Sequence, residues 1–292
     1  MSRVARWSVV IVGLVVLALL VTGCGRPSAQ TNSGTPAGAN KSEPAAKETI
    51  KVMVPCGQVG PFDAVTKLFE KQNPGVKLDW MPENMVTITE LVLDGKEQPD
   101  AFLSMGDLEV DRLEKAGKTV PGTRVAYAEN ALAITVPADN PAGVHSIADL
   151  AKPSVEAIVV PDPKLNSVGV HGIEALKGAG IWAQSEGKIS SPKYAADGKE
   201  MSQSGQVPVS IGYYPCVSEV HIKGQAPAKP KDIVMIGLVP QEYYKAFSCE
   251  GVVVKGCKNP EGGKKVLAML KTPEAQAIFK EWNFSRTITP AK

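Results

Sequence analysis

The feature that most constrains the fold is a regular alternation of strand and helix signals that begins at residue 49. The stretch TIKVMV (49–54) combines β-branched residues with an alternating pattern, which is typical of a strand. The stretch FDAVTKLFEK (62–71) places its apolar residues on one helical stripe. The alternation continues with a strand at 76–80, a helix at 86–93, a strand at 100–104 and a helix at 108–116. Such a rhythm predicts an α/β protein, with a parallel sheet covered by helices.

The second half of the chain keeps both kinds of element but spaces them differently. Further strands are predicted at 131–136, 157–160, 207–213, 233–238 and 250–255, with a helix at 169–178. Two terminal helices begin near Asn259 and Thr272. Thr272 places a capping hydroxyl directly before Pro273, which suits the first position of a helix.

The first 24 residues are predicted to be an export signal. Arg3 and Arg6 precede a mostly apolar run at 7–21, which is short for a membrane span and fits a signal peptide better. The run ends in small residues before Cys24, an arrangement that resembles a bacterial lipobox, in which the cysteine carries the lipid anchor. The alternative is a plain N-terminal membrane anchor. Both place the protein outside the cytoplasm.

The next segment, residues 25–48, is rich in Gly, Pro, Ala, Ser and Asn and has no large apolar residue. It cannot bury enough surface to offset its ordering entropy, so we predict a flexible tether. Without Arg3 and Arg6 the 32 basic residues fall to 30, which balance the 30 acidic ones. A chain with no net positive charge lacks the field that holds nucleic acid, so no nucleic-acid partner is expected.

The order of several segments resembles the molybdate-type substrate-binding proteins of ABC transporters. The segments are FEKQNPGVKL, DAFLS, DRLEKAG, NALAITVPADNPAG, SIADLA, VVPDP, EALKGAGIW and KNPEGGKKVLAMLKTPEAQAIF. The resemblance implies a type II periplasmic-binding-protein fold, in which two α/β lobes are joined by two crossing strands. The crossings would lie near 126–131 and 247–251. Lobe one would comprise 49–127 plus 248–292, and lobe two 128–247, with the ligand in the cleft between them.

The resemblance also predicts which residues meet the ligand. Proteins of this type bind oxyanions with serine hydroxyls, backbone amides and one tyrosine hydroxyl. The first of these serines falls at Gly57, and the second falls in the altered turn at 80–85, where Asn84 is the candidate. Asn166 or Ser167 supplies a donor in the third segment, and the tyrosine is kept as Tyr213.

Cysteines stand close to the positions where the hydroxyls are missing. Cys56 is next to Gly57, Cys216 follows Tyr213 by three residues, and Cys249 lies at the return crossing. Three interpretations stay open: a structural disulfide, with Cys56 and Cys249 as the first choice; a soft-ligand or metal site of Cys56, Cys216 and Cys249; or buried thiols without chemistry.

No sequence motif of catalysis is present, since HExxH, GxSxG, a phosphate loop and paired CxxC are all missing. We therefore predict a binding protein without enzymatic activity or cofactor. It would be an exported, lipid-anchored monomer that delivers a small inorganic solute to an ABC permease. The solute would be a molybdate- or tungstate-like oxyanion, or alternatively a thiophilic species such as arsenite or copper. A metal- or redox-handling lipoprotein that reuses the fold is a further alternative.

Overall fold

The computed structural model of the protein describes residues 47–217 and 233–287. The predicted export signal, Cys24 and the tether up to residue 46 lie outside the described residues. Lys47 and Glu48 were predicted as the end of the tether, but both of their N–H groups donate to the carbonyl of Gly75 and the first strand begins at Glu48. Within the described ranges, no helix is long and apolar enough to span a bilayer.

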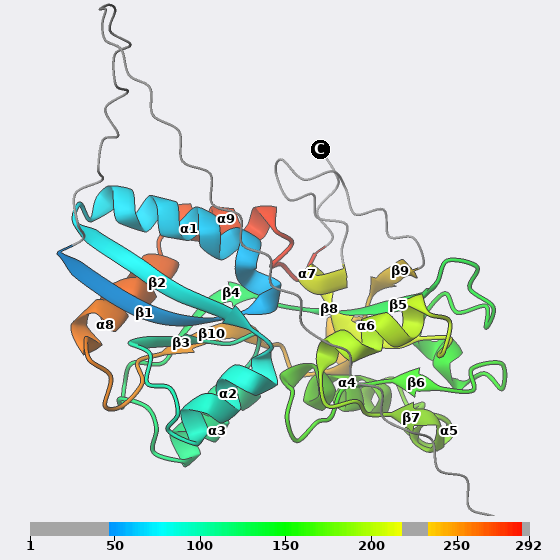
Figure 1. The fold of residues 1–292 in the computed structure, drawn as a ribbon. Coiled ribbons are helices and arrows are strands. Elements are labelled where there is room, and N and C mark those ends of the chain that lie inside the picture. Colours follow the sequence, from blue (N-terminus) through cyan, green and yellow to red (C-terminus); the bar gives the residue numbers. More distant parts are fainter. Residues whose placement is uncertain (1–46, 218–232, 288–292) are drawn as a thin grey trace, which may run out of the picture. The chain divides into compact units, whose positions relative to one another are not determined.

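The first sheet has the strand order β2-β1-β3-β10-β4 (Figure 1). Its strands are β1 (Glu48–Pro55), β2 (Val76–Glu83), β3 (Ala101–Leu103), β4 (Val125–Glu129) and β10 (Ser248–Val252). Strand β1 pairs in parallel with β2 and β3, whereas β10 runs antiparallel to β3 and β4. The sheet is therefore parallel where the predicted alternation lies, and a strand from the far end of the chain is inserted into it.

The second sheet has the order β7-β6-β8-β5-β9. Its strands are β5 (Leu132–Pro137), β6 (Ile158–Val159), β7 (Ile189–Ser190), β8 (Ser210–Tyr213) and β9 (Ile233–Leu238). Strand β6 is parallel to β7 and β8, and β5 is antiparallel to β8 and β9. We call the part built on the first sheet the first lobe and the part built on the second sheet the second lobe.

The chain passes between the two sheets twice. Only Asn130 and Ala131 separate β4 from β5, so the first passage lies inside the predicted range 126–131. The return runs from the end of β9 to the start of β10 and includes the short 3-10 turn η4 (Gln241–Tyr243). This is the predicted fold of two α/β lobes joined by two connections. The residue boundaries of the lobes stay a prediction, since contacts group residues 44–292 as one unit.

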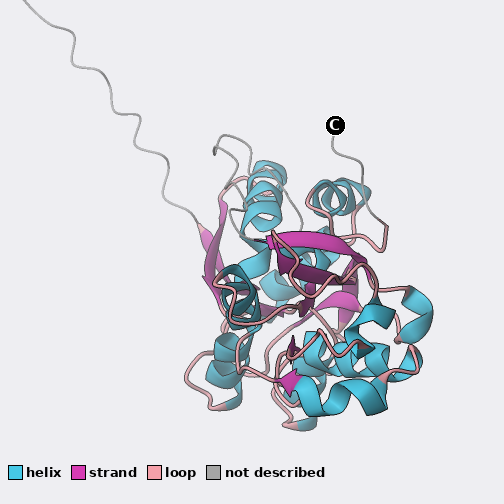
Figure 2. Ribbon diagram, turned by 90° about the vertical axis from the view of Figure 1, so that its right-hand side faces the viewer, coloured by secondary structure: helices cyan, strands magenta, loops and turns pink. Residues whose placement is uncertain are grey.

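Helices surround the strands of both sheets (Figure 2). Those of the first lobe are α1 (Val59–Gln72), α2 (Met85–Leu93), α3 (Leu108–Lys115), α8 (Pro260–Leu270) and α9 (Pro273–Glu281). Those of the second lobe are α4 (Ser167–Gly178), α5 (Trp182–Ser185), α6 (Ala195–Gln203) and α7 (Tyr214–Val217). The predicted cap of the last helix is confirmed, because the hydroxyl of Thr272 accepts from Ala275 N–H at 3.3 Å.

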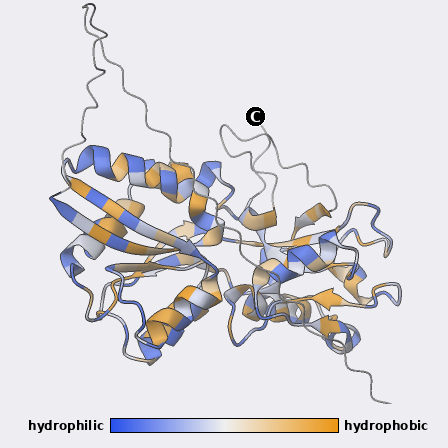
Figure 3. Cartoon of the chain, in the orientation of Figure 1, coloured by the Kyte–Doolittle hydropathy of each residue, from blue (hydrophilic) through white to orange (hydrophobic). Residues whose placement is uncertain are grey.

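Helix α1 illustrates how the apolar spacing places the core. Hydrophilic and hydrophobic residues alternate along it in Figure 3. The stripe predicted from the sequence is on its inner face: Phe62, Val65 and Phe69 are buried and Leu68 packs against the same core. Phe62 also meets Trp80 of β2 edge-on, with ring centroids 5.4 Å apart. Burial of this stripe fixes the start of α1, and with it the turn that precedes the helix.

Candidate functional site

A cavity of about 230 Å³ is lined by residues from both lobes. The first lobe contributes the end of β1, the 3-10 turn η1 (Cys56–Gln58), the start of α2 and Met105. The second lobe contributes Asn166 and residues of α6, β8 and α7. Of the predicted ligand-binding residues, those that line this cavity are Cys56, Gly57, Asn84, Asn166, Tyr213 and Cys216. Ser167 and Cys249 do not line it.

The first-lobe wall is formed by two turns at the carboxyl ends of neighbouring parallel strands, where ligands of α/β proteins commonly bind. Cys56 follows β1 and is exposed. Desolvation by the surrounding protein raises the pKa of the Cys56 thiol, and a hydrogen bond from the Gly57 N–H opposes this effect. Asn84 follows β2, and its side-chain oxygen caps α2 by accepting from Val86 N–H at 2.9 Å. Asn84 is thus held in place by the helix that it begins.

Gly57 and Cys216 touch across the cavity. A Cβ atom built on Gly57 would lie 2.7 Å from the Cys216 sulfur, which is closer than real Cβ contacts. The sulfur of the second lobe therefore occupies the space that a side chain at position 57 would need. A side chain at position 57, such as the serine that the resemblance predicts there, would therefore clash with this sulfur.

Burial raises the pKa of the Cys216 thiol to about 12, and the neighbouring Cys56 adds to this effect. A thiol with so high a pKa is protonated at neutral pH, and a protonated thiol is a poor metal ligand. Lys199 of α6 also lines the cavity, and its positive charge acts on Cys216 in the opposite direction. Lys199 is a cationic group that the sequence pattern did not single out.

Cys249 lies beneath the cavity rather than in it. It is fully buried, and its thiol donates to the Met105 carbonyl at 3.8 Å. Asn130 donates to the same carbonyl at 2.8 Å and to the Cys249 sulfur at 3.7 Å. Burial raises the pKa of Cys249 well above its usual value. The structure therefore makes Cys249 a support for Met105, whose side chain lines the cavity.

The prediction of a metal site of Cys56, Cys216 and Cys249 is wrong for this structure. Across the residues it describes, no group of three or more His, Cys, Asp and Glu side chains is placed to hold a metal ion. The disulfide alternative does not hold either, because Cys56 and Cys249 are both free. The physical reason is that Met105 and its hydrogen bonds take up the place of Cys249 at the cavity floor.

A buried network positions the same wall from behind. Tyr127 OH donates to Gln58 Oε1 at 2.6 Å, and Gln58 Nε2 donates to the Ser104 carbonyl at 3.2 Å. Gln58 Nε2 also lies 3.6 Å from the Met105 sulfur. Gln58 and Tyr127 are almost fully buried, so each needs these partners. The network fixes both η1 and Met105.

The start of α4 is engaged in internal contacts. Asn166 donates its side-chain N–H groups to the carbonyls of Asp162 at 3.3 Å and Lys193 at 2.9 Å. Tyr213 OH accepts from Val168 N–H at 3.1 Å, and burial raises its pKa well above the usual value. Tyr213 thus reaches the helix terminus as well as the cavity.

Ser167 is bound by the other lobe. Its backbone N–H donates to Glu109 Oε1 at 2.9 Å, its hydroxyl is hydrogen-bonded to Glu109 Oε2, and it accepts from Leu108 N–H at 3.0 Å. Ser167 was predicted to meet the ligand, but in the structure it meets a carboxylate of α3. The sequence pattern did not identify Glu109.

A second link between the lobes centres on His171. Its Nε2 lies 3.0 Å from Asp107 Oδ1 and its Nδ1 lies 2.9 Å from Glu174 Oε2, while its ring stacks on Phe247 at 4.3 Å. Burial alone would lower the pKa of His171, but the hydrogen bonds that its ring N–H groups donate to Asp107 and Glu174 raise it. The side chain of His171 is buried and ion-paired with both carboxylates.

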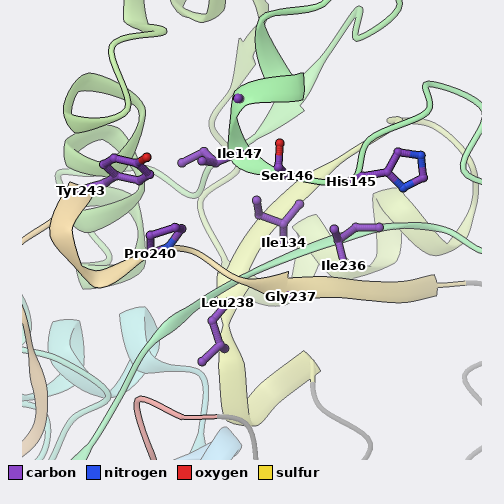
Figure 4. Close-up of a pocket in the computed structure, with 10 residues that line it drawn as sticks. Ile134, His145, Ser146, Ile147, Ile236, Gly237, Leu238, Pro240 and Tyr243 are labelled. Carbon is purple, nitrogen blue, oxygen red and sulfur yellow. The ribbon is translucent and has the colours of Figure 1, made fainter.

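Another hollow lies within the second lobe (Figure 4). Its volume is about 350 Å³, and Ile134, His145, Ser146, Ile236 and Tyr243 are among the residues that line it. None of the predicted ligand-binding residues lines it. It receives no residue of the first lobe, so closure of the lobes cannot enclose a solute there. We therefore place the candidate site at the cavity that both lobes line.

The sequence matches a known protein family over most of its length. A family profile described as bacterial extracellular solute-binding protein covers residues 50–285. The molybdate-binding protein of Rhodobacter capsulatus is 26% identical over 185 residues, which is 63% of this chain and 68% of that protein. The molybdate-binding protein of Mycobacterium tuberculosis is 27% identical over 154 residues, which is 53% of this chain and 56% of that protein.

Solved structures share the fold at lower identity. The periplasmic molybdate-binding protein of Azotobacter vinelandii has a TM-score of 0.62 at 17% identity, covering 83% of this chain and all of that one. The sulfate-binding protein of Mycobacterium tuberculosis has a TM-score of 0.62 at 16% identity, and the match covers 80% of this chain and 85% of that one. The substrate-binding protein of an Agrobacterium tumefaciens ABC transporter has a TM-score of 0.62 at 15% identity, and the match covers 82% of this chain and 78% of that one.

Proposed function

This chain belongs to the family of bacterial extracellular solute-binding proteins, and from that premise we propose that it is the receptor of an ABC importer for a small inorganic oxyanion. The family consists of binding proteins, so the chain is not an enzyme and acts outside the cytoplasm. The observation that carries the proposal is the cavity lined by Cys56, Gly57, Asn84 and Tyr213 at the junction of the lobes. Gly57, Asn84 and Tyr213 are residues that the resemblance predicts to meet the ligand, and Cys56 is next to Gly57.

The donors around the cavity suit an anion. The backbone N–H of Gly57 lies in the turn after β1, and the side-chain amide of Asn84 lies at the start of α2. The ammonium group of Lys199 comes from α6. Neutral donors satisfy the oxygens of an oxyanion in a dry site, and one lysine offsets part of its charge. Molybdate and tungstate are the first candidates, in keeping with the named relatives.

The first test is binding of molybdate and tungstate by the purified protein. Saturation at about 100 times the dissociation constant adds about 2.7 kcal/mol, which is a rise of about 5–10 °C in Tm for a domain of this size. Lys199→Met should weaken anion binding about tenfold, since a nearby charge is worth about 1–4 kcal/mol. Lys255→Met is the matched control, because Lys255 is exposed and does not line the cavity. If neither anion shifts Tm, the oxyanion proposal fails.

A second candidate solute rests on the sulfur atoms in the wall. Cys56, Met85, Met105 and Cys216 all line the cavity, and Cys56 and Cys216 act electrostatically on one another. Trivalent arsenic binds such thiols: each As–S bond formed replaces an As–OH bond, and the thiol proton leaves with the hydroxyl as water. Arsenite should then protect Cys56 from alkylation in the wild type but not in Cys216→Ser, and molybdate should protect it in neither. Alkylation of Cys56 at an unchanged rate would contradict this candidate.

We further propose that the protein is held at the membrane by a lipid on Cys24. The basic start, the apolar run and the small residues before Cys24 support this attachment. A Cys24→Ala variant expressed in a bacterial host should leave the membrane fraction and keep its solute affinity. Retention of that variant in the membrane fraction would instead support the uncleaved apolar segment as the anchor.

A further inference from the structure

Glu109 is a fully buried carboxylate that crosses from one lobe to the other. It lies in the first turn of α3, in the first lobe, and none of its surface is exposed. Both carboxylate oxygens are bound by Ser167, the first residue of α4 in the second lobe. The Ser167 hydroxyl accepts from Leu108 N–H, so its own proton is available to donate to Glu109 Oε2. This pattern fits an ionised Glu109 that receives two hydrogen bonds.

The hydrogen-bonding partner of the Glu109 carboxylate is the neutral Ser167. Burial raises the pKa of Glu109 above its usual value, and the hydrogen bonds from Ser167 oppose this rise. Helix α4 has 12 residues, and the N-terminus of such a helix carries a partial positive charge. Neutral donors at a helix terminus in a dry site are the means by which proteins hold anions.

The terminus of α4 lies directly behind the cavity wall. Asn166, the residue before Ser167, lines the cavity, and so do Met105 and Tyr213. The charge of Glu109 acts on Tyr213, and Tyr213 OH accepts from Val168 N–H, the next N–H of the same terminus. Removal of the Glu109 side chain would therefore leave space and free donors next to the cavity.

From these contacts we infer that Glu109 sets the anion selectivity of the site. Its carboxylate occupies the terminus of α4 as a built-in anion, so a divalent oxyanion in the cavity is denied the Ser167 donors and faces a like charge nearby. The inference deepens the proposed function and rests on it for the location of the cavity. It assigns to the unmodified protein a weaker affinity for divalent oxyanions than the same cavity would have without this carboxylate.

The test is calorimetric titration of molybdate and sulfate into the wild-type protein, Glu109→Ala and Glu109→Gln. We expect Glu109→Ala to bind molybdate at least about tenfold more tightly than the wild type, because a like charge is removed and two donors are freed. Glu109→Gln removes the charge but keeps the volume and should gain affinity by a smaller factor. The matched control is Glu114→Gln on the same helix, whose side chain is 40% exposed and pairs with Arg124. It changes net charge equally and should leave molybdate affinity unchanged.

Each outcome decides between the inference and the proposed function. If Glu109→Ala and Glu109→Gln bind molybdate no more tightly than the wild type, the inference is overturned, whatever the wild-type affinity is. If only the Glu109 variants bind molybdate, the inference holds and the oxyanion function of the unmodified protein fails. If Glu109→Ala does not fold, as judged by its melting curve, Glu109→Gln alone decides. A gain shared by Glu114→Gln would show a general charge effect and would overturn the inference.

Discussion

Gly106→Ala is expected to lower solute affinity by about 10- to 100-fold while each lobe keeps its fold. Gly106 lies where α3 faces α4, and a Cβ atom there would overlap the Cβ and Oγ atoms of Ser167. The Cβ atom of Ser167 is fixed to the backbone of α4 and cannot turn away as the end of a flexible side chain would. Overpacking of this kind costs about 1–3 kcal/mol, and 1.4 kcal/mol is a factor of ten in affinity. Since the clash exists only when the lobes meet, its cost falls on closure.

The measurement combines solute titration with small-angle scattering, which reports whether the lobes are closed. Gly187→Ala is the control, because a Cβ atom at that position meets nothing within 4 Å. We expect Gly106→Ala to be more extended than the wild type and the control to match the wild type. Unchanged affinity in Gly106→Ala would show that the contact between α3 and α4 is not part of the solute-bound form.

His171→Phe is expected to destabilise the protein by about 2–4 kcal/mol. Phenylalanine keeps a ring to stack on Phe247 but removes both ion pairs of His171. Removing one partner of a buried pair costs about 3–5 kcal/mol. The loss is smaller here because Asp107 stays 19% exposed and keeps a contact with Lys245 at 3.6 Å.

The loss of stability in His171→Phe should depend on pH. The pKa of His171 is raised in the folded protein, so its contribution is complete below its unfolded pKa and is lost as pH rises through the folded value. For Asp107, burial alone would raise the pKa, but the hydrogen bond and charge of His171 lower it to about 2. Its contribution is present above its unfolded pKa, 3.8, and is lost as pH falls toward 2. The pair therefore stabilises the protein most between about pH 4 and pH 6.5.

Urea unfolding of the wild type and His171→Phe at about pH 5.5 and about pH 9 measures this directly. The difference in the free energy of unfolding should be larger at the lower pH. Glu174, Lys245 and Glu109 are also near the pair, and all three remain in both proteins. His145→Gln is the control for the loss of an exposed histidine. A difference that is independent of pH would mean that His171 has the same pKa in the folded and the unfolded protein.

Most of the fold could be predicted from the sequence because its elements carry strong periodic signals. The stripe of Phe62, Val65 and Phe69 marked α1, and the Thr272-Pro273 pair marked the start of α9. Helix α6 was not predicted, since its sequence AADGKEMSQ contains a glycine and few large apolar residues. It forms because it packs on β8, which is a tertiary effect that no local pattern carries.

The site was predicted only where a resemblance supplied a position. Cys56, Gly57 and Tyr213 line the cavity, as expected from the resemblance to molybdate-type proteins. Glu109 and the pair of Asp107 and His171 were missed because each links residues far apart in the sequence. One signal was present: two acidic residues in SMGDLE directly follow β3, at the edge of the sheet where ligands bind. Acidic residues at the start of a helix are common caps, so the pattern alone did not indicate a partner in the other lobe.

Met105 joins the cavity wall to the first connection between the lobes and to the strand that follows the second connection. Asn130, which holds its carbonyl, is one of the two residues between β4 and β5, and Cys249, which also contacts that carbonyl, belongs to β10. Displacement of Met105 would therefore act on the Asn130–Ala131 connection and on β10 at the same time.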